Sequence, residues 1–172
     1  MLGFLAMGIR DLDRSMLKPL TNTFGFASNC FVCEPTNEAG LRLSFCHDDE
    51  RDVVVARHTF GTQHSGAPSL VHGGVIAAVC DDAMAWASIA LAGHFALTAE
   101  TRLTYLMPIP VDQEVTITGR LIGRVGKQLW LMADVRIGDT VHVRAESRAT
   151  VLSSEVAATA GVPNGPKGVS RE

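Results

Sequence analysis

The feature that most constrains the fold is the apolar stretch at residues 71–92, VHGGVIAAVCDDAMAWASIALA. It contains no proline, and a histidine and two glycines precede a long run of helix-compatible residues, so we expect one helix beginning near Gly73. Apolar side chains fall on several faces of this helix, and such a helix is buried in a core. The rest of the chain must therefore wrap around a central helix.

Two adjacent carboxylates, Asp81 and Asp82, interrupt this apolar helix. An aspartate is almost never fully buried without a partner or a function. The two side chains lie about 100° apart around the helix axis. Asp82 shares the side of Val79 and Trp86, so we interpret it as a structural or rim carboxylate. Asp81 is the candidate for a chemical function, and a purely structural Asp81 remains the alternative.

The segments around the helix predict strands. Residues 41–46 and 53–60 read as a hairpin around the acidic turn HDDER. Four further strands are expected after the helix, at residues 98–106, 114–123, 128–137 and 141–152. An antiparallel sheet wrapped around one helix accounts for this order, because the inner face of the sheet and the helix can bury each other. We therefore predict an α+β fold.

The chain has the length of a single domain, with 172 residues. We interpret residues 1–28 as a loose N-terminal cap segment and residues 29–152 as the folded domain. The tail at residues 153–172 is rich in glycine, proline, serine and alanine without an apolar period, which predicts disorder.

The composition is that of a soluble globular protein, with 47% apolar and 19% charged residues. A net charge of -3 provides no positive field to attract nucleic acid. The opening MLGFLAMG is apolar but has no basic region before it and no small-residue cleavage site, and no run reaches a membrane-spanning length. We expect a cytoplasmic protein with no nucleic-acid or membrane partner.

The four cysteines do not form the disulfide framework of a small secreted domain. Cys30 and Cys33, together with Cys46 and His47, could supply four zinc ligands. However, Cys46 and His47 are neighbours in a predicted strand and would point to opposite faces. A lone CxxC is also a weak signal. We therefore prefer thiols that behave as small apolar residues, and we predict no metal.

Three motifs together carry a family resemblance. They are HGG followed by six residues and Asp81, the TYLMP turn after the next strand, and the CFVCxPxNxxGLxL segment. Over roughly residues 28–152 the chain resembles hot-dog-fold acyl-CoA thioesterases of the phenylacetate-pathway, 4-hydroxybenzoyl-CoA thioesterase-like type. The resemblance implies the hot-dog fold, in which an antiparallel sheet wraps one long helix.

The resemblance also implies an activity and a site. The expected reaction is hydrolysis of an acyl-CoA thioester by a homodimer or a dimer of dimers, with no metal and no bound cofactor. Asp81 matches the catalytic carboxylate, which acts as general base or nucleophile, and Gly73 matches the residue whose N–H polarises the thioester carbonyl. Thr98 matches a residue that holds the water, and His72 lies beside the thioester. The alternatives are a capping role for His72 and an ordinary strand position for Thr98.

Elementary chemistry agrees with these assignments. The N–H groups at a helix start, at Gly73 and Gly74, can receive the negative charge of an attacked carbonyl. An apolar environment would raise the pKa of Asp81 and make it a better base. Gly74 and Asp81 are about 10 Å apart along one helix, so a single thioester cannot contact both. Two helices antiparallel across a dimer axis would bring Asp81 near the partner's Gly73.

The sequence indicates the residues that bind CoA less specifically than it indicates the catalytic residues. The CoA phosphates would suit the basic residues Arg102, Arg120, Arg124 and Lys127, and the turn at 124–127 is the best candidate; a solvated strand edge is the alternative. Some relatives have Asn or Gln where this chain has Gly66, and Gln63, His64 or Ser65 could substitute.

The acyl group is not specified by the sequence. An aromatic or medium-chain pocket could be lined by apolar residues, namely Phe60, Met84, Trp86, Ala87 and Met107. Two other functions remain open. One is a non-catalytic acyl-CoA-binding or sensor protein, and the other is a hot-dog hydratase or dehydratase, although neither an Asp-His nor a His-Glu pair is placed for it.

Overall fold

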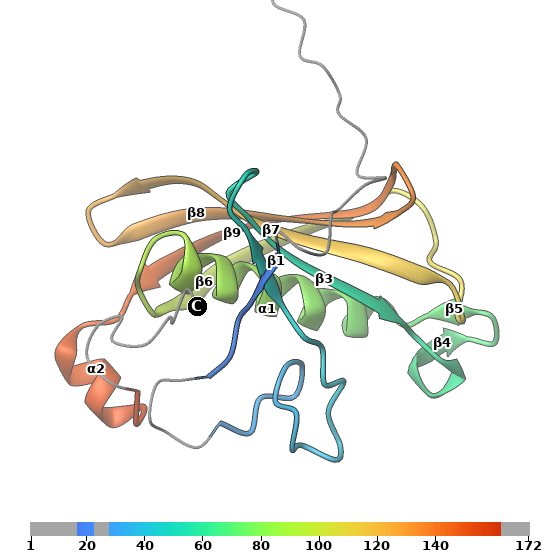
Figure 1. The fold of residues 1–172 in the computed structure, drawn as a ribbon, viewed down its shortest axis with the longest axis horizontal. Coiled ribbons are helices and arrows are strands. Elements are labelled where there is room, and N and C mark those ends of the chain that lie inside the picture. Colours follow the sequence, from blue (N-terminus) through green and yellow to red (C-terminus); the bar gives the residue numbers. More distant parts are fainter. Residues whose placement is uncertain (1–16, 23–27, 163–172) are drawn as a thin grey trace, which may run out of the picture.

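The computed structural model describes residues 17–22 and 28–162. Within these residues a seven-stranded sheet, antiparallel throughout, wraps around one long helix (Figure 1). The predicted architecture is confirmed. The strand order is β1-β2-β3-β7-β8-β9-β6. A small β4–β5 ladder and two short helices lie outside this sheet. In chain order the elements are β1 Leu17–Pro19, β2 Cys46–Asp48, β3 Val53–Thr59, η3 Thr62–His64, β4 Ser65–Ala67, β5 Leu70–Val71, α1 Gly73–Ala90, β6 Ala96–Tyr105, β7 Glu114–Val125, β8 Gln128–Ile137, β9 Thr140–Val151 and α2 Ser154–Thr159.

Helix α1 begins at Gly73, as predicted, and its end is set by backbone geometry. Leu91 closes the last turn, and Gly93 then adopts a left-handed conformation with φ of 69° while its N–H bonds to the Ile89 carbonyl. Glycine adopts this conformation without steric cost, which makes it a common helix stop.

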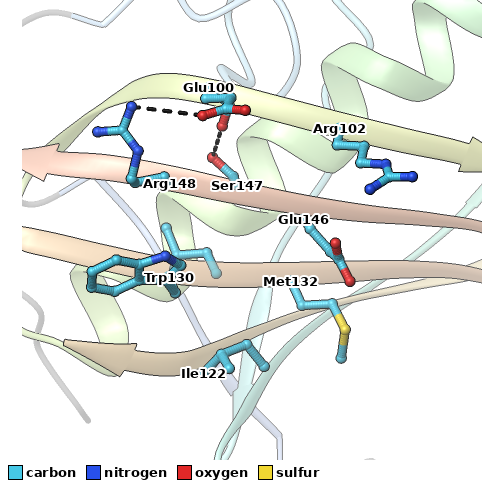
Figure 2. Close-up of a pocket in the computed structure, with 9 residues that line it drawn as sticks. Glu100, Arg102, Ile122, Trp130, Met132, Glu146, Ser147 and Arg148 are labelled. Atoms are coloured by element: carbon cyan, nitrogen blue, oxygen red, sulfur yellow. Dashed lines mark hydrogen bonds and ion pairs between the residues drawn. The ribbon is translucent and has the colours of Figure 1, made fainter.

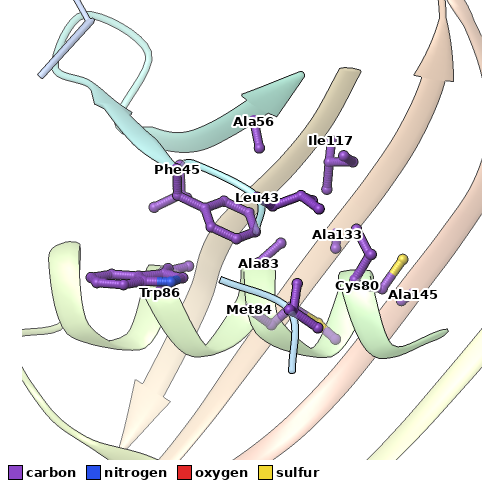
Figure 3. Close-up of a cluster of buried hydrophobic side chains, with 14 of the residues drawn as sticks. Leu43, Phe45, Ala56, Cys80, Ala83, Met84, Trp86, Ile117, Ala133 and Ala145 are labelled. Atoms are coloured by element: carbon purple, nitrogen blue, oxygen red, sulfur yellow. The ribbon is translucent and has the colours of Figure 1, made fainter. Parts of the chain in front are cut away.

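The core lies between α1 and the concave face of the sheet (Figure 3). Met84 and Ala83 of the helix are buried against residues of β3, β7 and β8, and Trp86 approaches Phe45 with ring centroids 6.4 Å apart. A Cβ at Gly119 of β7 would lie only 2.3 Å from the Ala83 carbonyl oxygen. The glycine in β7 therefore lets the helix backbone approach the sheet closely.

Strand β6 forms one edge of the sheet. It pairs with β9 on one side, with a bulge between Thr98 and Glu100, and no strand of the described part of the chain pairs with the other side. Most of its side chains are exposed, and Tyr105 remains 54% exposed. A long edge strand with free N–H and C=O groups is a surface for pairing with another strand.

The predicted strand at residues 41–46 is wrong. Strand β2 starts only at Cys46, and the preceding residues alternate in burial without joining the sheet. The N–H groups of Leu41 and Leu43 instead bond to the carbonyls of Phe31 and Val32, and Arg42 has a φ of 56°. The apolar side chains of this segment reach the core from an irregular backbone. The hairpin of β2 and β3 is confirmed.

The predicted disordered tail also needs correction. Ser153 caps a short helix, α2, by accepting from the Val156 N–H, and Ala157 is buried. Serine is a preferred N-cap because its hydroxyl satisfies a free N–H of the first turn. The remainder of the predicted tail, residues 163–172, and most of the predicted N-terminal cap segment lie outside the described residues.

Helix α1 is long and apolar enough to cross a membrane by length and composition alone, contrary to the expectation that no run reaches that length. Half of it is buried inside the protein. A core helix passes the same test, and the packing of α1 against the sheet accounts for its apolar composition.

Candidate functional site

Asp81 lies on the side of α1 that faces β6. It is half-buried, and its Oδ1 accepts a hydrogen bond of 2.8 Å from the Thr98 hydroxyl. Thr98 is exposed near the start of β6. The structure thus brings together two predicted site residues, and it holds the carboxylate in a fixed orientation beside the free sheet edge. The apolar environment expected for Asp81 is not found within one chain, because this side chain stays partly open to solvent.

His72 is the N-cap of α1. Its Nδ1 accepts a hydrogen bond of 2.8 Å from the Gly74 N–H. The capping alternative therefore describes its geometry, and Gly74 has no free N–H for a substrate carbonyl. The predicted role of Gly74 in substrate binding is corrected on this point, because an N–H already donated to a ring nitrogen cannot polarise a thioester.

Gly73 keeps its N–H available. No described residue accepts a hydrogen bond from it, while its carbonyl accepts one of 2.8 Å from the Tyr105 hydroxyl. Sequence reasoning missed Tyr105, although it belongs to the TYLMP motif. Gly73 and Tyr105 line a cavity of ≈310 Å³, to which Met107 also contributes.

The two contacts join α1 to β6 at opposite ends of the strand. Thr98 contacts Asp81, and Tyr105 contacts Gly73. Seven residues of strand separate these positions, or about 23 Å at ~3.3 Å per residue. The carboxylate and the free N–H of one chain are therefore apart, as the helix spacing predicted.

The loop before α1 explains why glycine occupies position 66. A Cβ at Gly66 would lie 2.9 Å from Cδ2 and 3.0 Å from Cα of His72, so a side chain here would displace the helix cap. Among Gln63, His64 and Ser65, it is His64 that hydrogen-bonds to His72. Its carbonyl accepts from the His72 N–H, and its buried Nδ1 has no hydrogen-bond partner. Burial lowers the pKa of the nearby His58, and His64 adds to that shift.

Arg102 lies on the opposite side of the sheet from Asp81 and Gly73. Figure 2 shows it on β6 beside a cavity of ≈480 Å³ that Glu100, Trp130 and Arg148 also line. Arg148 forms an ion pair of 3.7 Å with Glu100. The structure does not bring Arg102 to the predicted carboxylate.

The turn that contains Arg124 and Lys127 lies at the Thr98 end of the sheet. The Lys127 carbonyl accepts from the Val151 N–H, and Val151 pairs with Ala96 at the start of β6. The Arg124 side chain donates to the Gly126 carbonyl, which leaves its other N–H groups directed to solvent. These two cations are therefore on the same end of the molecule as Asp81.

Asp82 faces the other side of α1, next to the CxxC turn. Its Oδ1 accepts a hydrogen bond of 3.3 Å from the Cys30 thiol, and its Oδ2 is buried without a hydrogen-bond partner. The ligand atoms of Cys30, Cys33 and Asp82 all lie within 4.8 Å of one another. A cavity of ≈550 Å³, lined also by Trp86 and Phe45, opens beside them.

Burial raises the pKa of Asp82 to about 8, with a further contribution from the charge of Cys30. A hydrogen bond from Cys33 lowers the pKa of Cys30, while the pKa of Cys33 is raised by that same hydrogen bond and by burial. Cys30 and Cys33 are half-buried and pack against the core, as the sequence favoured, and Cys30 also donates to the Asp82 carboxylate. Cys80 is fully buried in the core.

The ligand set considered from the sequence does not assemble. Cys30, Cys33 and Asp82 are the one group of three or more potential metal ligands among the described residues. His47 instead contacts Asp49 at 2.8 Å and Asp52 at 3.4 Å. The third potential ligand is Asp82 of α1, which lies 49 positions after Cys33 in the chain and was not considered as a ligand from the sequence.

Comparison with known proteins identifies the domain. The thioesterase superfamily model matches residues 69–133, which contain α1, β6 and β7. This central segment of the chain is similar to the thioesterase superfamily. Mouse acyl-coenzyme A thioesterase THEM4 is 29% identical over 113 residues, which are 66% of this chain and 48% of that protein. The chain thus spans about half the length of this curated relative.

Solved structures confirm the hot-dog architecture. A crystal structure of a thioesterase superfamily protein has a TM-score of 0.63 at 26% identity, covering 69% of this chain and 57% of that one. The Escherichia coli PaaI protein of the phenylacetic acid degradation operon has a TM-score of 0.55 at 16% identity, covering 59% and 74%. The second similarity shows a shared fold, and the predicted family resemblance is confirmed.

Proposed function

We propose that this protein hydrolyses acyl-CoA thioesters to a free acid and CoA. The observation that carries the proposal is the position of Asp81, fixed by Thr98, and of the free Gly73 N–H at the two ends of one edge strand. The match to the thioesterase superfamily model and the name of the mouse relative support the same reaction class.

The proposed enzyme is a homodimer, alone or as a dimer of dimers, that pairs β6 with β6 of a second copy. Antiparallel pairing centred between Thr101 and Arg102 would set Thr98 opposite the partner's Tyr105. Asp81 of one chain would then approach the partner's Gly73, because each lies beside one of those strand residues. Two equivalent sites result. The pairing also covers the free edge of β6.

In each site, Asp81 activates a water molecule or attacks the thioester directly. Thr98 orients the carboxylate, and the partner's Gly73 N–H receives the negative charge that develops on the carbonyl oxygen. As a base, Asp81 takes a proton from the water that adds to the acyl carbon, the C–S bond breaks, and the proton passes to the sulfur of the leaving CoA. As a nucleophile, Asp81 itself displaces the CoA thiolate, which takes a proton from the solvent, and water then hydrolyses the acyl-aspartyl anhydride to the free acid and regenerates the carboxylate. This chemistry needs no cofactor and no metal at the reacting carbon.

Arg124 and Lys127 are proposed to bind the CoA phosphates, since both are exposed cations at the Asp81 end of the sheet. The ≈310 Å³ cavity beside Gly73, with Tyr105 and Met107 in its wall, suits an aromatic or medium-chain acyl group. We also propose the cytoplasm as the location, because its reducing environment suits four free cysteines.

The direct test is a panel of aromatic and medium-chain acyl-CoAs with a free-thiol readout. We expect turnover of at least one member at low temperature, including after incubation with a chelator. Tight binding without thiol release across the panel would support the sensor alternative instead.

A complementation experiment tests the shared site. Gly73→Pro deletes the proposed N–H, and proline is tolerated at the first position of a helix. Gly73→Pro and Asp81→Asn should each be nearly inactive. Refolded together, they should recover roughly a quarter of wild-type activity, since about half of randomly paired dimers are mixed and each has one intact site. No recovery, with mixed dimers shown by mass and Gly73→Pro shown to be folded, would exclude a site shared between chains.

A further inference from the structure

Two thiols and a carboxylate converge at a point that the proposed hydrolysis does not use. Cys30 and Cys33 come from the turn at residues 30–33, and Asp82 comes from α1, about 100° around the helix from Asp81. Their three ligand atoms lie within 4.8 Å of one another. This convergence joins two segments that are far apart in the sequence.

The geometry matches the requirements of a tetrahedral ion. For Zn–S of 2.3 Å and Zn–O of 2.0 Å, a sulfur and an oxygen ligand stand about 3.5 Å apart. The observed distance between Cys30 Sγ and Asp82 Oδ1 is 3.3 Å. Two sulfur ligands of one zinc ion stand about 3.8 Å apart, so shifts of about 1 Å or less would complete the site.

N–H donors approach the two sulfurs. The backbone N–H groups of Val32 and Cys33 approach Cys30 Sγ at 3.3 and 3.5 Å. The Trp86 indole donates to the sulfur of Cys33. Donors of this kind orient thiolate ligands and stabilise their charge when a metal is bound.

Asp82 is half-buried, but one of its carboxylate oxygens is fully enclosed. No lysine, arginine or histidine lines the adjacent cavity among the described residues, and Asp82 Oδ2 is buried without a hydrogen bond. An enclosed carboxylate oxygen without a cation or a hydrogen bond disfavours the ionised form, in line with the raised pKa of Asp82. A divalent ion would neutralise the carboxylate.

We propose that Cys30, Cys33 and Asp82 bind one zinc ion, with a water molecule from the cavity as the fourth ligand. Two thiolates favour zinc over magnesium or calcium, and the carboxylate disfavours copper(I). The ion fastens the irregular segment at residues 28–45 to α1. That segment contributes core residues Val32, Leu43 and Phe45 without belonging to the sheet, so a metal clip stabilises its attachment.

Cobalt(II) provides the test, because thiolate-to-cobalt charge transfer absorbs strongly in the near ultraviolet. The reduced, metal-stripped full chain is titrated with cobalt and then with zinc. We expect one equivalent of cobalt to bind, the charge-transfer band to appear, and zinc to displace it. Cys30→Ser and Cys33→Ser should lower the band by about half and weaken zinc binding by more than about 100-fold, since even outer-sphere partners are worth about 10–100-fold.

Two further variants test the third ligand and provide a control. Asp82→Asn should keep the sulfur band but weaken binding at least about 10-fold. Cys46→Ser is the matched control, because Cys46 lines the same cavity but lies outside the cluster, and it should bind cobalt like the wild type.

If a variant fails to fold, zinc binding by the wild-type protein still tests the proposal. Zinc should bind in a 1:1 ratio against a chromophoric chelator and should raise the unfolding temperature. Fully reduced wild-type protein that binds no stoichiometric zinc or cobalt, or a cobalt band that Cys46→Ser reduces and Cys30→Ser does not, would overturn the proposal. This outcome is independent of the hydrolysis assay.

Discussion

The two sides of α1 place the same residue type in opposite environments. On the β6 side, Asp81 is partly open to solvent and accepts from a threonine hydroxyl beside a free sheet edge. On the side of residues 28–45, Asp82 accepts from a cysteine thiol, and burial raises its pKa to about 8. The two residues are adjacent in the sequence, and a rotation of about 100° separates their surroundings.

The difference indicates that the two aspartates have different roles. A carboxylate beside an exposed edge can meet a second chain and a substrate, and one in a cavity between two segments of its own chain can hold those segments together. We therefore expect substitutions on the β6 side to act mainly on turnover and those on the other side mainly on stability.

The largest expected effect is that of Asp81→Asn. The change keeps the shape of the side chain but removes the base or nucleophile, so kcat/KM should fall about 100- to 10,000-fold. Circular dichroism and size-exclusion chromatography should show an unchanged fold and oligomer. Asp82→Asn should cost much less activity. If Asp82→Asn proved the more damaging of the two, the comparison would be reversed.

Removal of the proposed zinc ion from Cys30, Cys33 and Asp82 should lower the thermal stability of the protein. At free zinc about 100 times Kd, binding is worth about 2.7 kcal/mol. Because each kcal/mol moves Tm by about 2–4 °C at this chain length, chelation should lower Tm by about 5–10 °C. Thermal unfolding by calorimetry measures this shift, and initial hydrolysis rates at low temperature should not change. Loss of activity with an unchanged Tm would instead indicate that the ion takes part in hydrolysis.

Thr98→Val should lower kcat about 10-fold, since it removes a hydrogen bond to a charged group worth about 1.5 kcal/mol or more. Thr98→Ser is the matched control and should retain most activity, because serine can donate the same bond. Steady-state kinetics on a substrate from the thiol assay separates the two variants. Equal losses in both would mean that the hydroxyl is not what positions Asp81.

The smallest expected effect belongs to His72, which caps α1. His72→Ala should lower the free energy of unfolding by about 1 kcal/mol, as measured by urea denaturation. His72→Asn should restore most of that stability, because asparagine is a strong N-cap. An asparagine variant that is stable but inactive would show that the imidazole takes part in turnover in addition to capping.

The sequence by itself determined the central helix, the hairpin of β2 and β3 and the four long strands after α1. Their hydrophobic patterns are local, and the turns between them carry glycine or acidic residues. It also predicted the separation of Asp81 from Gly73, because helical rise fixes that distance within one chain. The family motifs pointed to Thr98, which the fold then placed 2.8 Å from the carboxylate.

Only the tertiary structure decided which distant residues meet. Residues 41–45 alternate like a strand, yet Leu41 and Leu43 bond to the backbone of the CxxC turn, a pairing that no local pattern encodes. The same folding brings Cys30 and Cys33 to Asp82 rather than to Cys46 and His47. Sequence spacing constrains neighbours along one helix or strand, whereas the partners of a loop depend on how the whole core packs.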